Sequence, residues 1–92
     1  MSVLFRFQPG GLTREKYDQI NRDLEQSGAW PPPGLQLHVM FGNEGDLRVS
    51  EIWESEEQQH TFSEQLLPAL ERAGVQLSGQ PDVFEVHELQ QP

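Results

Sequence analysis

The residue best suited to chemistry is Glu51, a carboxylate in an otherwise apolar row. Leu47, Val49, Glu51 and Trp53 alternate along a predicted strand and fall on one face of it. Burial between Val49 and Trp53 disfavours a charged carboxylate, which suits Glu51 to accept and return protons. The alternative is structural, with an arginine, the Tyr17 hydroxyl or a helix-end amide satisfying the carboxylate. Glu51 is the predicted catalytic residue.

Four aromatic residues are candidates to line a ligand pocket around Glu51, namely Trp53, Tyr17, Phe62 and Trp30. Tyr17 could place its hydroxyl near Glu51, and Trp53 would form a wall that stacks on a ligand. Each could instead be an ordinary core residue, because large aromatic side chains are on average highly buried. Trp30 lies in the proline-rich segment 29–34, where it would either anchor that segment or close a lid over a pocket.

The histidines do not form a metal site in the predicted arrangement. His38 and His87 are expected on the same sheet face, one on each edge strand, with Glu85 as the nearest further ligand. We therefore predict no metal and no cofactor, and interpret both histidines as hydrogen-bonded interface residues. His60 is interpreted as a solvated helix residue. The sequence has no nucleophile–base motif, phosphate-binding glycine loop or dinucleotide fingerprint.

The composition restricts the classes of partner. Six Lys/Arg against fifteen Asp/Glu give a net charge of -9, and such a surface repels phosphate backbones and anionic lipids. No apolar run approaches the roughly 20 residues that cross a bilayer, and the N-terminal segment lacks the layout of a signal peptide. We therefore expect a cytoplasmic protein that binds neither nucleic acid nor membrane.

The length predicts a single domain, 1–92. A domain of this size buries only about 60–65% of the surface of its unfolded chain. Cysteine is absent, so disulfides cannot add stability. Oligomerisation is the remaining common route.

The hydrophobic pattern predicts four strands and two helices. The strands are expected at 2–8, 35–41, 47–53 and 82–89, and the helices at 14–27 and 56–73. Thr13 and Ser55 are the predicted N-caps of the two helices, and Gly28 and Gly74 are predicted to end them. Pro68 is expected to kink or break the second helix near Leu67. This β-α-β-β-α-β order predicts an α+β, ferredoxin-like fold with both helices on one face of an antiparallel sheet, in strand order 4-1-3-2.

Strand alternation divides the predicted sheet into two faces. The helix-covered face would carry Val3, Phe5, Phe7, Leu37, Val39, Phe41, Leu47, Val49, Trp53, Phe84 and Val86, together with Glu51. The other would carry Leu4, Arg6, Gln36, His38, Met40, Arg48, Ser50, Ile52, Val83, Glu85, His87 and Leu89. The second face is too apolar for a sheet surface in water. We therefore expect a homodimer whose interface contains His38, Met40, Arg48, Ser50, Ile52 and His87.

The chain resembles the dimeric α/β-barrel superfamily. The resemblance rests on the strand–helix order, the run VSEIWESEE at 49–57, the open second face, the WPPPG segment at 30–34, His38 and the ending Val86-His87. Within the superfamily the chain is similar to antibiotic-biosynthesis-monooxygenase-like proteins, and most of all to small uncharacterised relatives. Catalytic members perform cofactor-independent oxygenation, haem degradation, chlorite breakdown or isomerisation in a cavity between sheet and helices. The haem-degrading members carry a Trp and a His on the second helix, where this chain has Phe62 and Arg72.

Two functions follow as hypotheses. In the first, a homodimer binds a small apolar or aromatic organic molecule between sheet and helices, with monooxygenase-like or isomerase-like chemistry at Glu51 as one outcome; whether it is an enzyme stays open. In the second, it is a non-catalytic interaction or structural module with a filled core. An apolar pocket of ~300 Å3 or more that touches Glu51 would favour ligand binding.

Overall fold

The computed structural model describes residues 1–77 and 79–92. Its elements are β1 (Val3–Phe7), β2 (Pro9–Gly10), α1 (Arg14–Gln26), β3 (Leu35–Asn43), β4 (Asp46–Trp53), α2 (Glu56–Arg72), β5 (Gln76–Leu77) and β6 (Asp82–Glu85). Four strands form an antiparallel sheet in the order β3-β4-β1-β6, which confirms the predicted ferredoxin-like fold and its strand order.

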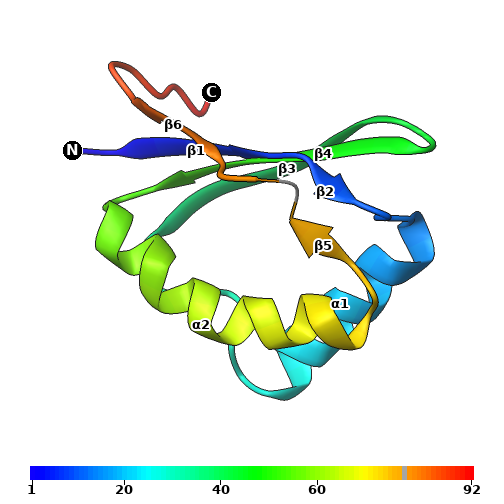
Figure 1. Cartoon of the computed structure of the whole chain (residues 1–92). Coiled ribbons are helices and arrows are strands. Elements are labelled where there is room, and N and C mark those ends of the chain that lie inside the picture. Colours follow the sequence, from blue (N-terminus) through cyan, green and yellow to red (C-terminus); the bar gives the residue numbers. More distant parts are fainter. Residues whose placement is uncertain (78) are drawn as a thin grey trace.

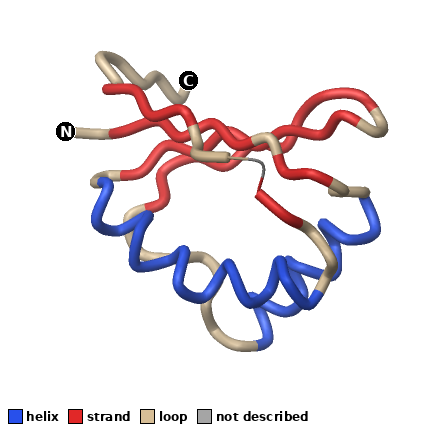
Figure 2. Tube along the Cα trace, in the orientation of Figure 1, coloured by secondary structure: helices blue, strands red, loops and turns tan. Residues whose placement is uncertain are grey.

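The molecule has two layers. Both helices lie on one side of the sheet, and in the described part of the chain no helix or strand lies on its other side (Figures 1 and 2). The C-terminal segment after β6 lies on that other side and reaches β3, where the Gln91 side chain donates to the Gln36 carbonyl. The short strands β2 and β5, which were not predicted, pair with each other between the end of β1 and the end of α2. The core lies between the layers and includes Phe5, Ile20, Leu24, Trp53, Phe62 and Leu70.

The helix boundaries follow local sequence signals. The Thr13 hydroxyl accepts a hydrogen bond from the Lys16 N–H, and the Ser55 hydroxyl accepts one from the Gln58 N–H, which confirms both predicted N-caps. Ser27 and Ala73 are the C-caps, directly before Gly28 and Gly74. The two helices are joined by an exposed hydrogen bond from Arg72 to Asp23, which raises the pKa of Arg72.

α2 runs unbroken through Pro68, so of the kink or break predicted near Leu67 the break is wrong. Pro68 removes the hydrogen bond that the carbonyl of Glu64 would accept. Both residues are exposed, so water can take the place of the missing donor. Neither helix of the described chain is long and apolar enough to span a membrane.

β3 contains a β-bulge that reverses its predicted faces. Leu35 pairs with Trp53 and Leu37 pairs with Ile52, so Gln36 is one extra residue in β3. A single extra residue exchanges the two faces of the strand from that point on.

The prediction for β3 is therefore wrong from Leu37 onward. His38 lies opposite Glu51 on the helix-covered face, and Met40 follows it there opposite Val49. The large apolar side chains that alternate with them lie on the open face. They are Leu37, Val39 and Phe41, with 36%, 40% and 41% of their surface exposed.

The faces of the last strand are also opposite to the prediction, although its pairing with β1 contains no bulge. Phe84 pairs with Leu4 on the open face and is 51% exposed, whereas Val83 pairs with Phe5 on the covered side. In this register the Arg6 side chain on β1 forms an ion pair with Asp82 at 3.8 Å and lies over the Phe84 ring. β6 ends at Glu85 instead of residue 89, so the predicted strand is too long.

Candidate functional site

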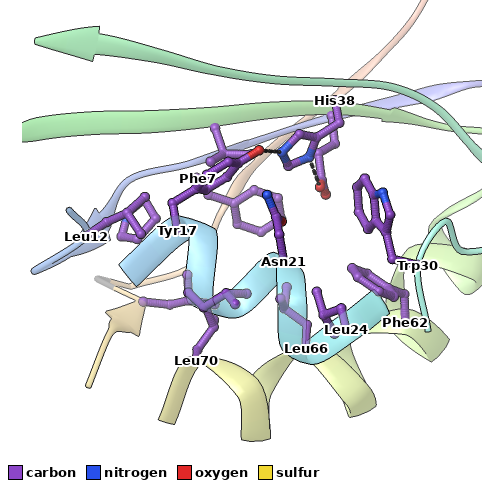
Figure 3. Close-up of a pocket in the computed structure, with 15 residues that line it drawn as sticks. Phe7, Leu12, Tyr17, Asn21, Leu24, Trp30, His38, Phe62, Leu66 and Leu70 are labelled. Atoms are coloured by element: carbon purple, nitrogen blue, oxygen red, sulfur yellow. Dashed lines mark hydrogen bonds and ion pairs between the residues drawn. The ribbon is translucent and has the colours of Figure 1, made fainter. Parts of the chain in front are cut away.

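A chain of hydrogen bonds connects α1, β3 and β4 on the covered side of the sheet. The Tyr17 hydroxyl oxygen lies 2.8 Å from His38 Nε2, and His38 Nδ1 lies 2.7 Å from Glu51 Oε2. The indole N–H of Trp53 donates to Glu51 Oε1 at 3.1 Å. Figure 3 shows the first two of these interactions, with the Tyr17 hydroxyl directed at the His38 ring. We call Tyr17, His38, Glu51 and Trp53 the relay.

Local structure places each member of the relay. His38 and Glu51 are direct cross-strand partners, and Trp53 follows Glu51 on the same face of β4. Tyr17 lies on the face of α1 that also carries the buried Ile20. Without the bulge at Gln36, His38 would lie on the other face of the sheet and the relay could not form.

Burial makes the pairing of Glu51 essential. Glu51 is 3% exposed and Trp53 is 0% exposed. A buried carboxylate requires hydrogen-bonding partners, and each oxygen of Glu51 has one. The sequence suggested an arginine, Tyr17 or a helix-end amide as the partner; the structure places His38 and Trp53 there. Tyr17 contacts Glu51 only through His38.

The donors and acceptors of the relay follow from its chemistry. The indole N–H of Trp53 can only donate, so Glu51 Oε1 accepts. We assign the proton between Glu51 and His38 to Nδ1, because an ionised carboxylate only accepts and an imidazole N–H can donate to it at 2.7 Å. Nε2 of the neutral ring is then an acceptor, and the Tyr17 hydroxyl donates to it. The hydrogen bonds of the neutral relay therefore run from Tyr17 to His38 to Glu51.

The relay borders an apolar cavity of about 60 Å3 between the sheet and the helices. Tyr17, His38 and Glu51 line it together with apolar side chains that include Leu12, Ile20, Leu24, Trp30, Phe62 and Leu66. Three of the four aromatic residues predicted to line a pocket thus do so. Trp53 does not line the cavity, and lies behind Phe62 with the ring centres 5.5 Å apart.

Trp30 closes one end of the cavity. Its ring meets the His38 ring edge-on at 5.3 Å between centres, and the Phe62 ring at 6.1 Å. The segment 29–34 thus connects α1 to β3 and also contributes a wall beside the relay (Figure 3). In this position Trp30 is half-buried, which fits both an anchor and a closed lid.

Asn21 is a pocket residue that sequence reasoning missed. It lines the cavity one helical turn after Tyr17, and Figure 3 shows its side chain directed from α1 toward the sheet. Within the described chain its carboxamide forms no hydrogen bond. The i, i+4 spacing from Tyr17 was the signal that could have revealed it.

The predicted interface residues divide between three places. Arg48, Ser50 and Ile52 lie on the open face of β4, while His38 and Met40 lie on the covered face because of the bulge. His87 follows the end of β6 and is exposed. Within residues 1–77 and 79–92, no three His, Cys, Asp or Glu side chains gather in a way that could hold a metal ion.

Comparison with known proteins shows the fold. No family model and no curated protein sequence matches the chain. Among solved structures it is similar to SnoaB from Streptomyces nogalater, a cofactor-independent oxygenase, with a TM-score of 0.65, 10% identity and coverage of 96% of this chain and 95% of that one. A candidate antibiotic biosynthesis monooxygenase from Deinococcus radiodurans has a TM-score of 0.57 and 16% identity, with 100% and 98% coverage.

The chain thus has the fold of the antibiotic-biosynthesis-monooxygenase-like proteins, an α+β ferredoxin-like arrangement. The de novo designed protein Foldit4 shares it too, with a TM-score of 0.59, 13% identity and coverage of 95% of this chain and 100% of that one. An oxygenase and a designed protein on one scaffold show that the fold alone does not decide the function.

Proposed function

We propose that this protein is a homodimer that binds a small apolar or aromatic organic molecule in the cavity between sheet and helices. The relay would act on that molecule as a base, in cofactor-independent monooxygenase-like or isomerase-like chemistry. The observation that carries the proposal is that a hydrogen-bonded chain of polar groups borders a cavity whose other lining side chains are apolar, except for Asn21. Apolar pockets with a few convergent polar groups are typical of small-molecule sites.

The cavity size limits the ligand. At about 60 Å3 it has room for only a few water molecules, and it falls well below the ~300 Å3 from which typical ligand pockets begin. The closed form suits a ligand of only a few heavy atoms, because a cavity that holds a benzene ring has a volume of about 150 Å3. A larger one requires Trp30 to move away from His38 and Phe62.

The small cavity also favours the second candidate, a non-catalytic module whose interior is filled core. In that case the relay would only satisfy Glu51, and Trp30 would be a permanent anchor. The two candidates differ in whether a ligand that enters the cavity stabilises the fold.

Ligand binding can be tested with a cavity-filling variant and a neighbouring control. Leu66 lines the cavity, whereas the adjacent Leu67 is 50% exposed and does not. We would screen single-ring aromatic compounds by thermal shift against wild type, Leu66→Trp and Leu67→Trp, and examine the purified protein by native mass spectrometry for a retained molecule. A ligand that binds the folded state raises its stability by mass action.

The expected result is a compound that raises the melting temperature of wild type and Leu67→Trp but not of Leu66→Trp. If no compound of the screen stabilises wild type and no retained molecule is found, the filled-core alternative holds.

The dimer is supported by the open face of the sheet. It carries four large apolar side chains that are more than a third exposed, at Leu37, Val39, Phe41 and Phe84. Exposed apolar patches of this kind often mark interaction sites, and a two-fold dimer would cover the same patch on both copies.

A further inference from the structure

We propose that the relay is built to take a proton from a hydroxyl group, so that the ligand is a small phenol or a similarly acidic hydroxyl compound. A carbonyl compound or an ether of the same shape would bind less well. This inference rests on the proposed function and specifies the ligand class of the same site.

The first step is the position of the Tyr17 proton. In the neutral relay this single proton is donated to His38 Nε2, at 2.8 Å between the heavy atoms. Tyr17 lines the cavity, and its hydroxyl oxygen retains lone pairs. Toward a ligand, the Tyr17 oxygen therefore acts as a hydrogen-bond acceptor. It selects a ligand that has a hydrogen-bond donor, such as a hydroxyl group.

The second step is that the relay cannot readily reverse. If Tyr17 turned its proton toward a ligand carbonyl, His38 Nε2 would lose its partner beside the apolar ring of Trp30. Leaving a buried polar atom unpaired costs more than a typical hydrogen bond returns. The other end of the relay is fixed too, because Glu51 accepts from both His38 and Trp53.

The third step is the path of the proton. The ligand O–H bond breaks and its proton moves to the Tyr17 oxygen, while the Tyr17 proton moves to His38 Nε2. The products are a ligand oxyanion, a neutral Tyr17 and an imidazolium. Glu51 stabilises the imidazolium through the 2.7 Å contact with Nδ1, and no oxidant or further reactant is needed.

Asn21 supplies the remaining interaction that an oxyanion requires. Its carboxamide lines the same cavity and has no hydrogen-bonding partner in the described part of the chain. Its N–H groups can donate to the ligand oxygen, as the newly formed Tyr17 O–H also does. Trp53 acts as a positioning residue, since its N–H fixes the Glu51 carboxylate.

The test compares each phenol with its methyl ether, in which a methyl group replaces the hydroxyl hydrogen. Phenol and anisole form one pair, which enters the cavity once Trp30 moves, and para-nitrophenol and para-nitroanisole form a second pair, in which the phenolate of para-nitrophenol is visible by its absorbance. Binding is measured by calorimetry and by ligand-observed NMR, and ionisation by the absorbance of bound para-nitrophenol. The variants are Tyr17→Phe, His38→Gln and, as an exposed control on α2, His60→Gln.

Wild type and His60→Gln should bind each phenol at least about tenfold more tightly than its methyl ether, because the ether leaves the Tyr17 oxygen without a donor. They should also increase the ionised fraction of para-nitrophenol. Tyr17→Phe should lose the preference while it still binds the ethers. His38→Gln should still bind the phenols but no longer increase their ionisation.

Equal affinity of wild type for phenol and ether would overturn this inference, yet leave the proposed ligand-binding function intact. A preference that persists in Tyr17→Phe would also overturn it, because another group would then accept the proton. If neither pair binds wild type, this inference fails. The proposed function fails with it only if the broader aromatic screen also finds no ligand.

Discussion

The decisive residue is Glu51, and its role depends on its two partners. An unpaired carboxylate between Val49 and Trp53 would oppose folding, but here the Trp53 indole and the His38 imidazole each donate to one oxygen. The same contacts that stabilise Glu51 also give His38 a charged partner for its protonated form. Structural and functional roles for Glu51 are therefore compatible.

Replacing Glu51 by Gln should destabilise the protein. The amide offers one oxygen to two N–H donors, so either Trp53 loses its acceptor or His38 must adopt the other tautomer. We expect a loss of about 1–3 kcal/mol in the free energy of unfolding, measured by urea denaturation at neutral pH.

Glu57→Gln is the control, because Glu57 is exposed in the first turn of α2 and its loss should cost no more than about 0.5 kcal/mol. A Glu51→Gln variant as stable as wild type would show that the carboxylate is not held by these two donors.

At the level of single residues, strand alternation and helix spacing allowed Glu51, Tyr17 and Phe62 to be placed together. Trp30 was a candidate because it is the large aromatic residue of the proline-rich segment 29–34. His38 could not be placed, because one extra residue in its strand decides which face it occupies. Gln36 lies between two leucines, and the alternation of polar and apolar residues continues through it without any sign of a bulge. The alternation of polar and apolar residues therefore could not identify His38 as the partner of Glu51.

The elements themselves were largely predictable. Caps, stops and periodicity identified both helices and all four strands of the sheet, and chain topology gave their order. The faces of β3 and β6 were predicted wrongly for a common reason. Hydrophobic alternation does not identify the covered face when both faces of a sheet are apolar. Leu37, Val39, Phe41 and Phe84 are large and apolar but lie on the open face.

The bulge in β3 should be required for the relay. Deleting Gln36 removes the extra residue and should turn His38 away from Glu51, or else displace the segment that carries Trp30. We expect ΔGln36 to lose the hydrogen-bonded, slowly exchanging His38 ring N–H signal in proton NMR and to be less stable than wild type.

Gln36→Ala retains the bulge and should retain that signal, which separates loss of the residue from loss of its side chain. Persistence of the signal in ΔGln36 would mean that the strand can recover its register without the bulge.

At the scale of the whole molecule, the open face is the main unexplained surface. It carries apolar side chains in the centre and along both edges of the sheet, with Arg6 and Arg48 among them. A chain of net charge -9 should repel its own copies at a distance, so any association must come from contacts on this face. Fold and strand order were predictable at this scale, but which side chains form the open face was not.

Val39→Glu should convert the proposed dimer to a monomer. Val39 is 40% exposed within one chain, so the substitution should be tolerated in a monomer, whereas Ile52 is only 6% exposed and would report on folding as well. Light scattering at micromolar concentration should give twice the chain mass of 10.5 kDa for wild type and the single mass for Val39→Glu, because a buried unpaired charge is costly.

Leu67→Glu provides the matched control on α2, where a comparable side chain is 50% exposed, and it should remain dimeric. A wild-type mass equal to one chain would reject the dimer.

The most direct test of the relay is the protonation of the His38 ring, read by long-range proton–nitrogen NMR at neutral pH. We predict a neutral ring with the proton on Nδ1, in slow exchange with water, because Glu51 accepts at Nδ1 and Tyr17 donates to Nε2. Exposed His60 supplies the reference for a solvated ring in the same spectrum. A proton on Nε2 of His38, or a spectrum that matches His60, would contradict the direction of the relay and the mechanism built on it.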